Sequence, residues 1–313
     1  MSLVRRRRRR RSILIGLLVA IAAGASIGAF AVSTDTFGAG HLFERAVARI
    51  DRFIAGPVPD RPTDGTVLVT SPPATPEPTE PPTPRPRASG ATASSTPGPT
   101  PMPTPARTPF DVDIATDPEA VFAHEIEKTW CAPAGVQMTL AVLGLADTSD
   151  DFQRELQGRV REWESLGDSR NGNWGPSAMV LALEAYGAPG YEVRAYESRE
   201  TALRDAAVAI ESAGAPVILL AWRGAHTWVM TGFRADADPR VFPDALVEGA
   251  YVLDPWYPSI SSIWGPSDPP GTFQDSAEME RNYLPWKRPE GGYPERDGLF
   301  ISVVPTVAIN RPG

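Results

Sequence analysis

A proline-rich segment divides this 313-residue chain and confines any packed core to the C-terminal part. Residues 57–109 hold about half of the 34 prolines, mixed with Thr, Ser and Ala. Such a composition buries too little apolar surface to offset the entropy of ordering the chain, and it favours extended polyproline conformations. We therefore predict a disordered linker over 57–109 and one folded domain over 110–313, which is long enough for a sizeable core.

The residues before the linker have the pattern of an export signal. An unbroken arginine run, Arg5–Arg11, predicts a cytoplasmic tail over 1–12, and residues 13–32 carry no charge and are long enough to cross a bilayer as a helix. Within residues 33–56, apolar side chains recur at helical spacing, which predicts a juxtamembrane amphipathic helix. The pattern predicts a single-pass protein of the cell membrane whose C-terminal domain is extracellular.

Two further expectations depend on that placement. Residues 29–31 (AFA) resemble a signal-peptide cleavage site, so a cleaved and secreted form is the alternative, although the length of the apolar run favours an uncleaved anchor. A proline-rich stalk after a membrane anchor makes the cell wall a candidate partner besides the membrane. The net charge of −8, which already includes the arginine run, argues against nucleic acid as a partner.

Helical signals come first in residues 110–313, and strand signals follow. Capping residues and Gly or Pro stops predict helices over 131–143, 149–163, 176–186 and 199–213. Apolar and alternating runs predict strands over 216–222, 226–234, 251–253 and 299–304. Helices followed by closely spaced strands predict an α+β domain, with N-terminal helices and a mostly antiparallel sheet.

Cys131 is the only cysteine of the chain, and it stands at the start of a predicted helix. A lone thiol in an oxidising compartment has no internal disulfide partner and is exposed to oxidation. The N–H groups and the positive end of the dipole at a helix start stabilise a thiolate, which indicates a nucleophile. A small buried structural cysteine is the alternative.

A thiol nucleophile needs a base, and that base needs a group that orients it. The predicted domain offers His124, in a stretch of undefined structure, and His226, which begins a strand beside a tight connection. A strand start holds a side chain rigidly at the edge of a cleft, so His226 is the better candidate. Asp254 follows the next predicted strand, although an Asp before Pro is also a common way to start a turn.

Three short motifs in this order resemble the C39-like peptidases of the papain-like cysteine peptidase superfamily. Residues 130–134 (WCAPA) are similar to the nucleophile motif of that family, and residues 225–233 (AHTWVMTGF) to its histidine strand. Residues 252–255 (VLDP) are similar to the motif that carries the third residue. The resemblance covers roughly residues 115–260.

The resemblance implies a papain-like fold, no cofactor, and a peptide or protein substrate. Cys131 would be the nucleophile, His226 the general base and then acid, and Asp254 the residue that orients the imidazole. The predicted function is thus an extracellular, membrane-anchored cysteine peptidase that works through a thioester acyl-enzyme. Two alternatives remain: a non-catalytic papain-like domain that binds peptide or cell-wall ligands, and a cell-wall amidase or transpeptidase with the same triad.

One position departs from the family. Papain-like enzymes usually have a Gln several residues before the cysteine as an oxyanion donor, whereas Glu125 and Glu127 stand in this region. An ionised carboxylate would repel an oxyanion, so we expect that Glu125→Gln does not lower activity. Gln137 lies two helical turns beyond Cys131 and is not expected to reach the site.

Three tryptophans are candidate substrate-binding residues: Trp174, Trp228 and Trp256. Trp174 lies in a glycine-rich loop at the expected rim of the cleft. Trp256 opens a stretch rich in proline and aromatic residues, 255–289, that either lines a groove or, as we favour, pins an irregular segment to the core. No cluster of His, Cys and Asp has the spacing of metal ligands, so no metal is expected.

Overall fold

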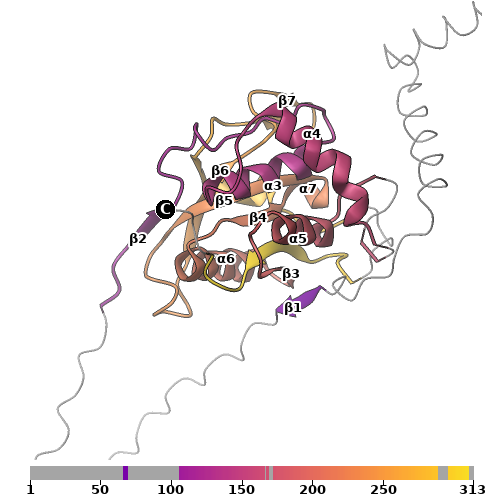
Figure 1. The fold of residues 1–313 in the computed structure, drawn as a ribbon. Helices are drawn as coiled ribbons and strands as arrows, with labels where there is room; N and C mark the ends of the chain where they lie inside the picture. The colour runs from indigo at the N-terminus through magenta and orange to yellow at the C-terminus, as the bar shows by residue number, and fades with distance from the viewer. Residues whose placement is uncertain (1–65, 70–105, 166, 169–171, 288–294, 310–313) are drawn as a thin grey trace, which may run out of the picture. The chain divides into compact units, whose positions relative to one another are not determined.

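A mostly antiparallel sheet carries the fold (Figure 1). The structure is a computed structural model that describes residues 66–69, 106–165, 167–168, 172–287 and 295–309. Its main sheet has the strand order β1-β3-β10-β4-β5-β6-β9, and β2 pairs with the second half of β5. The bounds of these strands are β1 Val67–Val69, β2 Phe110–Asp113, β3 Tyr191–Tyr196, β4 Val217–Leu220, β5 His226–Ala235, β6 Val247–Leu253, β9 Thr272–Asp275 and β10 Phe300–Pro305.

Helices cover both faces of the sheet. The bounds are α3 Cys131–Val142, α4 Asp150–Arg159, the 3-10 turn η3 Val160–Glu162, α5 Pro176–Ala185, α6 Arg199–Ala213, the short turn α7 Ala221–Gly224 and α8 Ser276–Asn282. Residues of α3 and α5 share one hydrophobic cluster with the sheet, and residues of α6 share another. A small hairpin of β7 (Ile260–Ser261) and β8 (Gly265–Pro266) forms a separate sheet.

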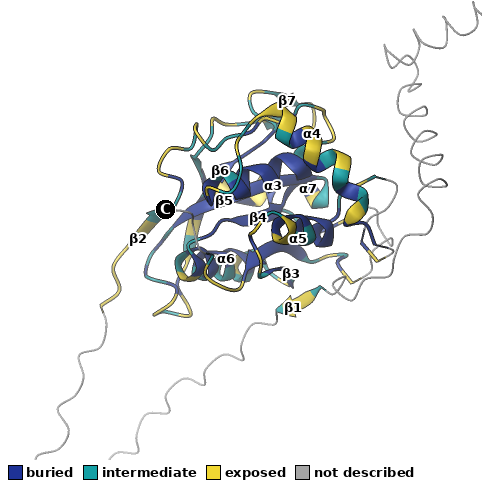
Figure 2. Ribbon diagram, viewed as in Figure 1, coloured by how far each residue is buried: buried dark blue, intermediate teal, exposed yellow. Residues whose placement is uncertain are grey.

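Strand β4 shows how a continuous apolar run serves two layers. All four of its residues are buried. Ile218 and Leu220 pack into the cluster of α3 and α5, whereas Val217 and Leu219 pack into the cluster of α6. Because successive side chains of a strand point to opposite faces, a strand between two helical layers needs apolar residues at every position. Figure 2 shows β4 and its neighbours as buried.

The ends of α6 confirm the prediction of a helix over 199–213. The Ser198 side chain accepts a hydrogen bond from the backbone N–H of Thr201, at 3.1 Å. Gly214 ends the helix with φ 62, a left-handed conformation that suits a residue without Cβ. The helix expected over 149–163 is shorter: α4 ends at Arg159 and continues as the 3-10 turn η3.

Among the described residues, six strands lie where the sequence did not predict them: β1, β2, β3, β7, β8 and β9. β3 alternates buried and half-buried residues, but Glu192 and Arg194 interrupt its apolar pattern. These two side chains form an ion pair at 2.6 Å, so the strand presents a charged face that hides its signal. Val67–Val69, inside the range predicted as linker, form β1 and pair in parallel with β3.

The expected transmembrane helix and the single-pass location are corrected by the structure. In the described part of the chain, none of the helices has both the length and the apolar character that a bilayer crossing requires. The longest of them, α6, has 15 residues and carries charged side chains, whereas a span needs about 20 apolar residues. The predicted tail 1–12, span 13–32 and juxtamembrane helix 33–56 all lie outside the described residues.

Candidate active site

The ends of two neighbouring strands bring His226 and Asp254 together. β5 and β6 are antiparallel, with Val229 opposite Leu253, so the start of β5 lies beside the end of β6. His226 Nε2 is 2.7 Å from Asp254 Oδ1, and both residues are buried. The backbone N–H of Trp256 also donates to Asp254 Oδ1, at 2.9 Å, and this bond holds the carboxylate in place.

Cys131 lies on the other side of the imidazole. It is the first residue of α3, it is partly exposed, and its Sγ lies within 4.8 Å of a ring nitrogen of His226. Because Nε2 faces Asp254, Nδ1 is the ring nitrogen left for the thiol. Burial alone would lower the pKa of His226, but the Asp254 carboxylate and then the Cys131 sulfur outweigh it and raise that pKa to about 10.

Gly135 sets how closely α3 approaches β5. A Cβ on Gly135 would lie 2.5 Å from Cγ2 of Thr227, the residue that follows His226. Gly135 lies one helical turn after Cys131 on the same face of α3. A side chain there would push α3 off the strand and move Cys131 away from His226.

A cavity of about 350 Å³ opens beside Cys131 and His226. Its apolar lining includes Trp174, Met179 and Trp286. Trp174 is fixed by a hydrogen bond from its Nε1 to Gln157 Oε1, at 2.8 Å. The volume lies in the range of small-molecule and side-chain pockets, about 300–1,000 Å³.

Trp228 and Trp256 lie elsewhere. Neither is among the residues that line this cavity. Trp228 is buried in the cluster of α6, and Trp256 meets the ring of His226 edge-on, with centroids 6.4 Å apart. The structure therefore places Trp256 as packing around the imidazole, in keeping with the interpretation of 255–289 as a segment held by large side chains.

Sequence reasoning missed Trp222, which stacks on the imidazole. The ring centroids of Trp222 and His226 are 4.0 Å apart, with an interplanar angle of 18°. Trp222 and Arg223 have φ 51 and 62, a left-handed conformation that is strained for side chains other than Gly. The strand therefore ends at Leu220 rather than at residue 222, and the indole turns back over the histidine. Nothing in the local sequence signals this turn except Gly224.

A buried ion pair supports two walls of the cavity. Arg296 Nη1 is 2.7 Å from Asp168 Oδ1, and both residues are buried. The other oxygen of Asp168 accepts the backbone N–H of Ala178 in the first turn of α5, at 3.1 Å. The guanidinium of Arg296 also lies 5.7 Å from the ring of Trp286. The pair thus links the base of α5 to the Trp286 wall.

Glu125, which the sequence places before Cys131 in the region of the expected oxyanion donor, is buried beside the thiol, and its burial was not predicted. Its side chain is 4% exposed, and neither carboxylate oxygen has a hydrogen-bond partner. One oxygen of Glu125, Cys131 Sγ and a ring nitrogen of His226 all lie within 4.8 Å of one another. Burial raises the pKa of Glu125 to about 7, with His226 acting to lower it and Asp254 to raise it.

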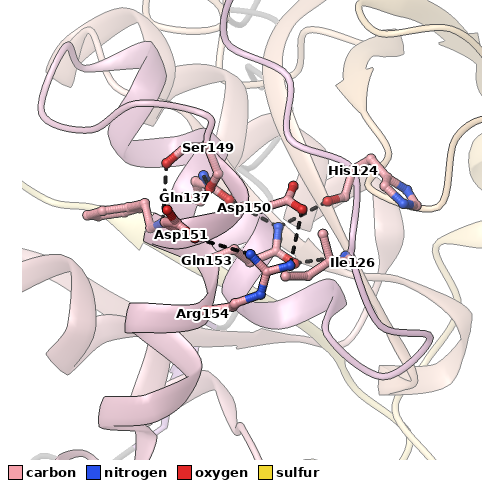
Figure 3. A network of polar contacts seen from close by, with 9 residues as sticks. His124, Ile126, Gln137, Ser149, Asp150, Asp151, Gln153 and Arg154 are labelled. Atoms are coloured by element: carbon pink, nitrogen blue, oxygen red, sulfur yellow. Dashed lines mark hydrogen bonds and ion pairs between the residues drawn. The ribbon is translucent and has the colours of Figure 1, made fainter.

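A polar network holds the backbone on both sides of Glu125 (Figure 3). Gln153 Nε2 donates to the carbonyl of His124, and Gln153 Oε1 accepts the N–H of Ile126, both at 3.0 Å. Gln153 Nε2 also donates to Gln137 Oε1, at 3.0 Å. Gln137 is occupied in this network, as expected for a residue that does not reach the site. His124 itself is exposed.

Glu125, Cys131 and His226 are residue types that also bind metal ions. Their spacing along the chain gave no metal pattern, because the fold brings them together from three separate segments. A metal on Sγ and on the nitrogen that faces it would occupy the groups that form the thiol–imidazole pair. We therefore do not assign these side chains as metal ligands.

No protein-family model matches the chain, and neither does any curated protein sequence. Among solved structures, the chain is similar to one described as a double glycine motif protease from AMS/PCAT transporter in complex with the leader peptide. The identity is 18%, the match covers 59% of this chain and 91% of that chain, and the TM-score is 0.32. Mixed helices and strands around one large sheet are compatible with the papain-like peptidase fold.

Proposed function

We propose that this protein is a papain-like cysteine peptidase in which Cys131, His226 and Asp254 form the catalytic triad. The observation that carries the proposal is the position of His226, whose Nε2 is 2.7 Å from Asp254 and which has a ring nitrogen within 4.8 Å of Cys131 Sγ. A thiol, an imidazole and a carboxylate in this order form the arrangement that activates a nucleophile for acyl transfer.

The raised pKa of His226 keeps its imidazole protonated at neutral pH, and in the proposed mechanism this imidazolium pairs with the Cys131 thiolate. In the first half-reaction the thiolate attacks the peptide carbonyl carbon, a C–S bond forms, and the carbonyl electron pair moves to oxygen. The C–N bond then breaks while His226 gives its proton to the leaving amine. In the second half-reaction His226 takes a proton from water, whose oxygen attacks the thioester, and the thiolate leaves.

The cavity beside the thiol supports a peptide side chain as its occupant. We propose Trp174 as a substrate-contacting residue, because it lines the cavity and its indole is held by Gln157. Trp174, Met179 and Trp286 supply apolar contacts in a lining that also contains polar residues such as Thr129 and Thr227, so the cavity can hold a peptide side chain without requiring an apolar one.

Thiol alkylation tests the triad without knowledge of the substrate. The rate of Cys131 alkylation by iodoacetamide is measured from pH 4 to 9 in the full chain and in its His226→Ala variant. We expect the wild-type rate at pH 6 to stay within about 5-fold of the rate at pH 9, because a thiolate paired with imidazolium persists at acid pH. His226→Ala should slow alkylation at pH 6 at least 10-fold.

Hydrolysis of a mixed set of unmodified peptides, followed by mass spectrometry, then tests the activity itself. Cleavage that disappears in Cys131→Ser supports the peptidase. The proposal is overturned if the alkylation rate falls about 10-fold per pH unit below pH 8 and is the same in the wild type and in His226→Ala. The remaining interpretation would then be a binding domain. Peptide joined to an added amine, in place of hydrolysis, points to transpeptidase chemistry.

A further inference from the structure

The Glu125 carboxyl is a buried acid placed against the nucleophile with no partner for its charge. Both of its oxygens are closed off from solvent and form no hydrogen bond. Its backbone N–H donates to the carbonyl of Pro255 at 2.9 Å, directly after Asp254, and Gln153 holds the residues on either side. The side chain is therefore kept at the site by its backbone rather than by a counter-ion.

Burial favours the neutral form of this carboxyl, and Asp254 adds to this effect, whereas His226 acts against it. Cys131 faces it from the start of α3, His226 from the start of β5, and Asp254 acts on it from the end of β6. Gln153 of α4 contacts only the backbone beside Glu125. One imidazolium would have to balance the thiolate, Asp254 and Glu125 together, and the buried carboxylate has no hydrogen bond to stabilise it.

Acyl transfer needs hydrogen-bond donors for the oxyanion. This oxyanion is the former carbonyl oxygen of the substrate, on the carbon that becomes bonded to Sγ. The backbone N–H of Cys131, at the start of α3, supplies one, and the N-cap residue Trp130 makes no side-chain capping bond that competes for this helix end. A protonated carboxyl is a hydrogen-bond donor, whereas a carboxylate can only accept. A neutral Glu125 within 4.8 Å of Sγ would supply a second donor.

We propose that Glu125 takes part in catalysis as a neutral acid that donates its O–H to the oxyanion formed on Cys131; this inference rests on the proposed peptidase function. The proton stays on Glu125, so no bond to it is made or broken in the step. The oxyanion is itself a negative charge and holds the acid in its neutral form, as in other sites where a buried carboxyl serves as a donor.

This role predicts an enzyme that works at acid to neutral pH. Above a Glu125 pKa of about 7 the donor becomes a carboxylate that repels the oxyanion, while His226, with a pKa of about 10, still holds its proton. Activity should therefore fall near pH 7, well below the pH at which the thiolate–imidazolium pair is lost. A Gln at this position donates from its amide at every pH.

The test is hydrolysis of 4-nitrophenyl acetate by the full chain from pH 5 to 9.5, with EDTA present and Cys131→Ser as the blank. This small ester acylates a reactive thiol without a specific peptide. Wild-type activity should fall at least 10-fold between pH 6 and 8.5. Glu125→Gln activity should fall less than 3-fold over the same range, and at pH 8.5 it should be at least 3-fold higher than the wild-type activity. Glu127→Gln, at an exposed position, is the matched control and should follow the wild type.

Glu125→Leu, which removes the donor, should lose about 100-fold at pH 6, as expected for an oxyanion donor. Its alkylation by iodoacetamide should keep the wild-type pH profile, which separates a donor from a residue that only stabilises the thiolate. A Glu125→Gln profile that falls at the same pH as the wild type overturns the inference, as does Glu125→Leu activity within 3-fold of the wild type at pH 6. An alkylation rate that does not change in His226→Ala would instead contradict the proposed peptidase function itself.

Discussion

Asp168 and Glu125 are both buried carboxyls, but only Asp168 forms an ion pair with an arginine. Asp168 faces Arg296 at 2.7 Å and also accepts the N–H of Ala178. Glu125 has neither an ion pair nor a hydrogen bond to its oxygens. A buried carboxylate with a guanidinium and an N–H partner anchors structure, whereas a buried carboxyl without partners is more stable as a neutral acid.

The comparison distinguishes a structural carboxyl, Asp168, from a carboxyl that lies beside the proposed reacting groups, Glu125. Asp168 and Arg296 join segments that form cavity walls, and nothing in their geometry reaches the thiol. Glu125 joins no elements through its side chain but lies within 4.8 Å of Cys131 and His226. The absence of a partner at Glu125 is therefore the feature that points to function, because the fold gains no stability from burying an unpaired carboxyl.

The largest effect is expected when the ion pair is broken. Asp168→Asn keeps the shape of the side chain but removes the closer and more buried of the two carboxylates beside Arg296, the other being Glu295 at 3.8 Å. This should lower the free energy of unfolding by about 3 kcal/mol. Urea unfolding at pH 7 measures the change. Asp150→Asn, which removes an exposed pair with Arg154 at 3.3 Å, is the control and should change stability by about 0.5 kcal/mol or less. A loss below about 1 kcal/mol in Asp168→Asn would show that the two buried acids do not differ in this way.

A comparable effect, with a defined pH window, is expected from Glu125→Gln. An unfolded Glu loses its proton near its ordinary pKa of 4.5, but folded Glu125 keeps it to about pH 7. Between these values the folded state binds more protons, so wild-type stability falls as the pH rises through the window, by on the order of 3 kcal/mol. The Gln variant does not titrate there, so its stability relative to the wild type should rise by this amount from pH 4 to 8.

Urea unfolding across that range checks the prediction, with Glu127→Gln as the exposed control. Should the wild type and Glu125→Gln keep a constant difference in stability at all pH values, Glu125 would be charged in the folded protein, and the contrast with Asp168 would disappear.

The smallest of the three effects concerns the backbone around Glu125. Gln153→Leu removes the amide that bonds His124, Ile126 and Gln137, and leaves buried polar groups unpaired at a cost of about 2 kcal/mol. We also expect slower ester hydrolysis, because the segment that carries Glu125 loses its support. Arg154→Ala, the next residue on α4 with an exposed ion pair, should stay near wild type in both assays. Equal effects of the two substitutions would contradict a positioning role for Gln153.

Local signals were enough to find most helices and the three triad candidates. Ser198 and Gly214 mark the ends of α6 because capping depends on residues three or four positions apart. Local signals failed at β3, where the Glu192–Arg194 pair masks the alternation, and at Trp222, whose left-handed backbone no residue pattern announces. The prediction of a membrane-spanning helix was wrong, because none of the described helices is long and apolar enough to cross a membrane. The domain limits before residue 110 stay predictions.

By itself, the sequence determined which chemistry the chain carries: a lone cysteine at a helix start, a histidine that begins a strand, and an aspartate that ends the next one. Only the tertiary structure decided which groups meet. His226 and Asp254 are brought to 2.7 Å because β5 and β6 are antiparallel neighbours, and Arg296 finds Asp168 far back along the chain. The state of Glu125 also belongs to the fold, because a carboxyl is charged or neutral according to its burial and its partners, and no stretch of sequence contains either.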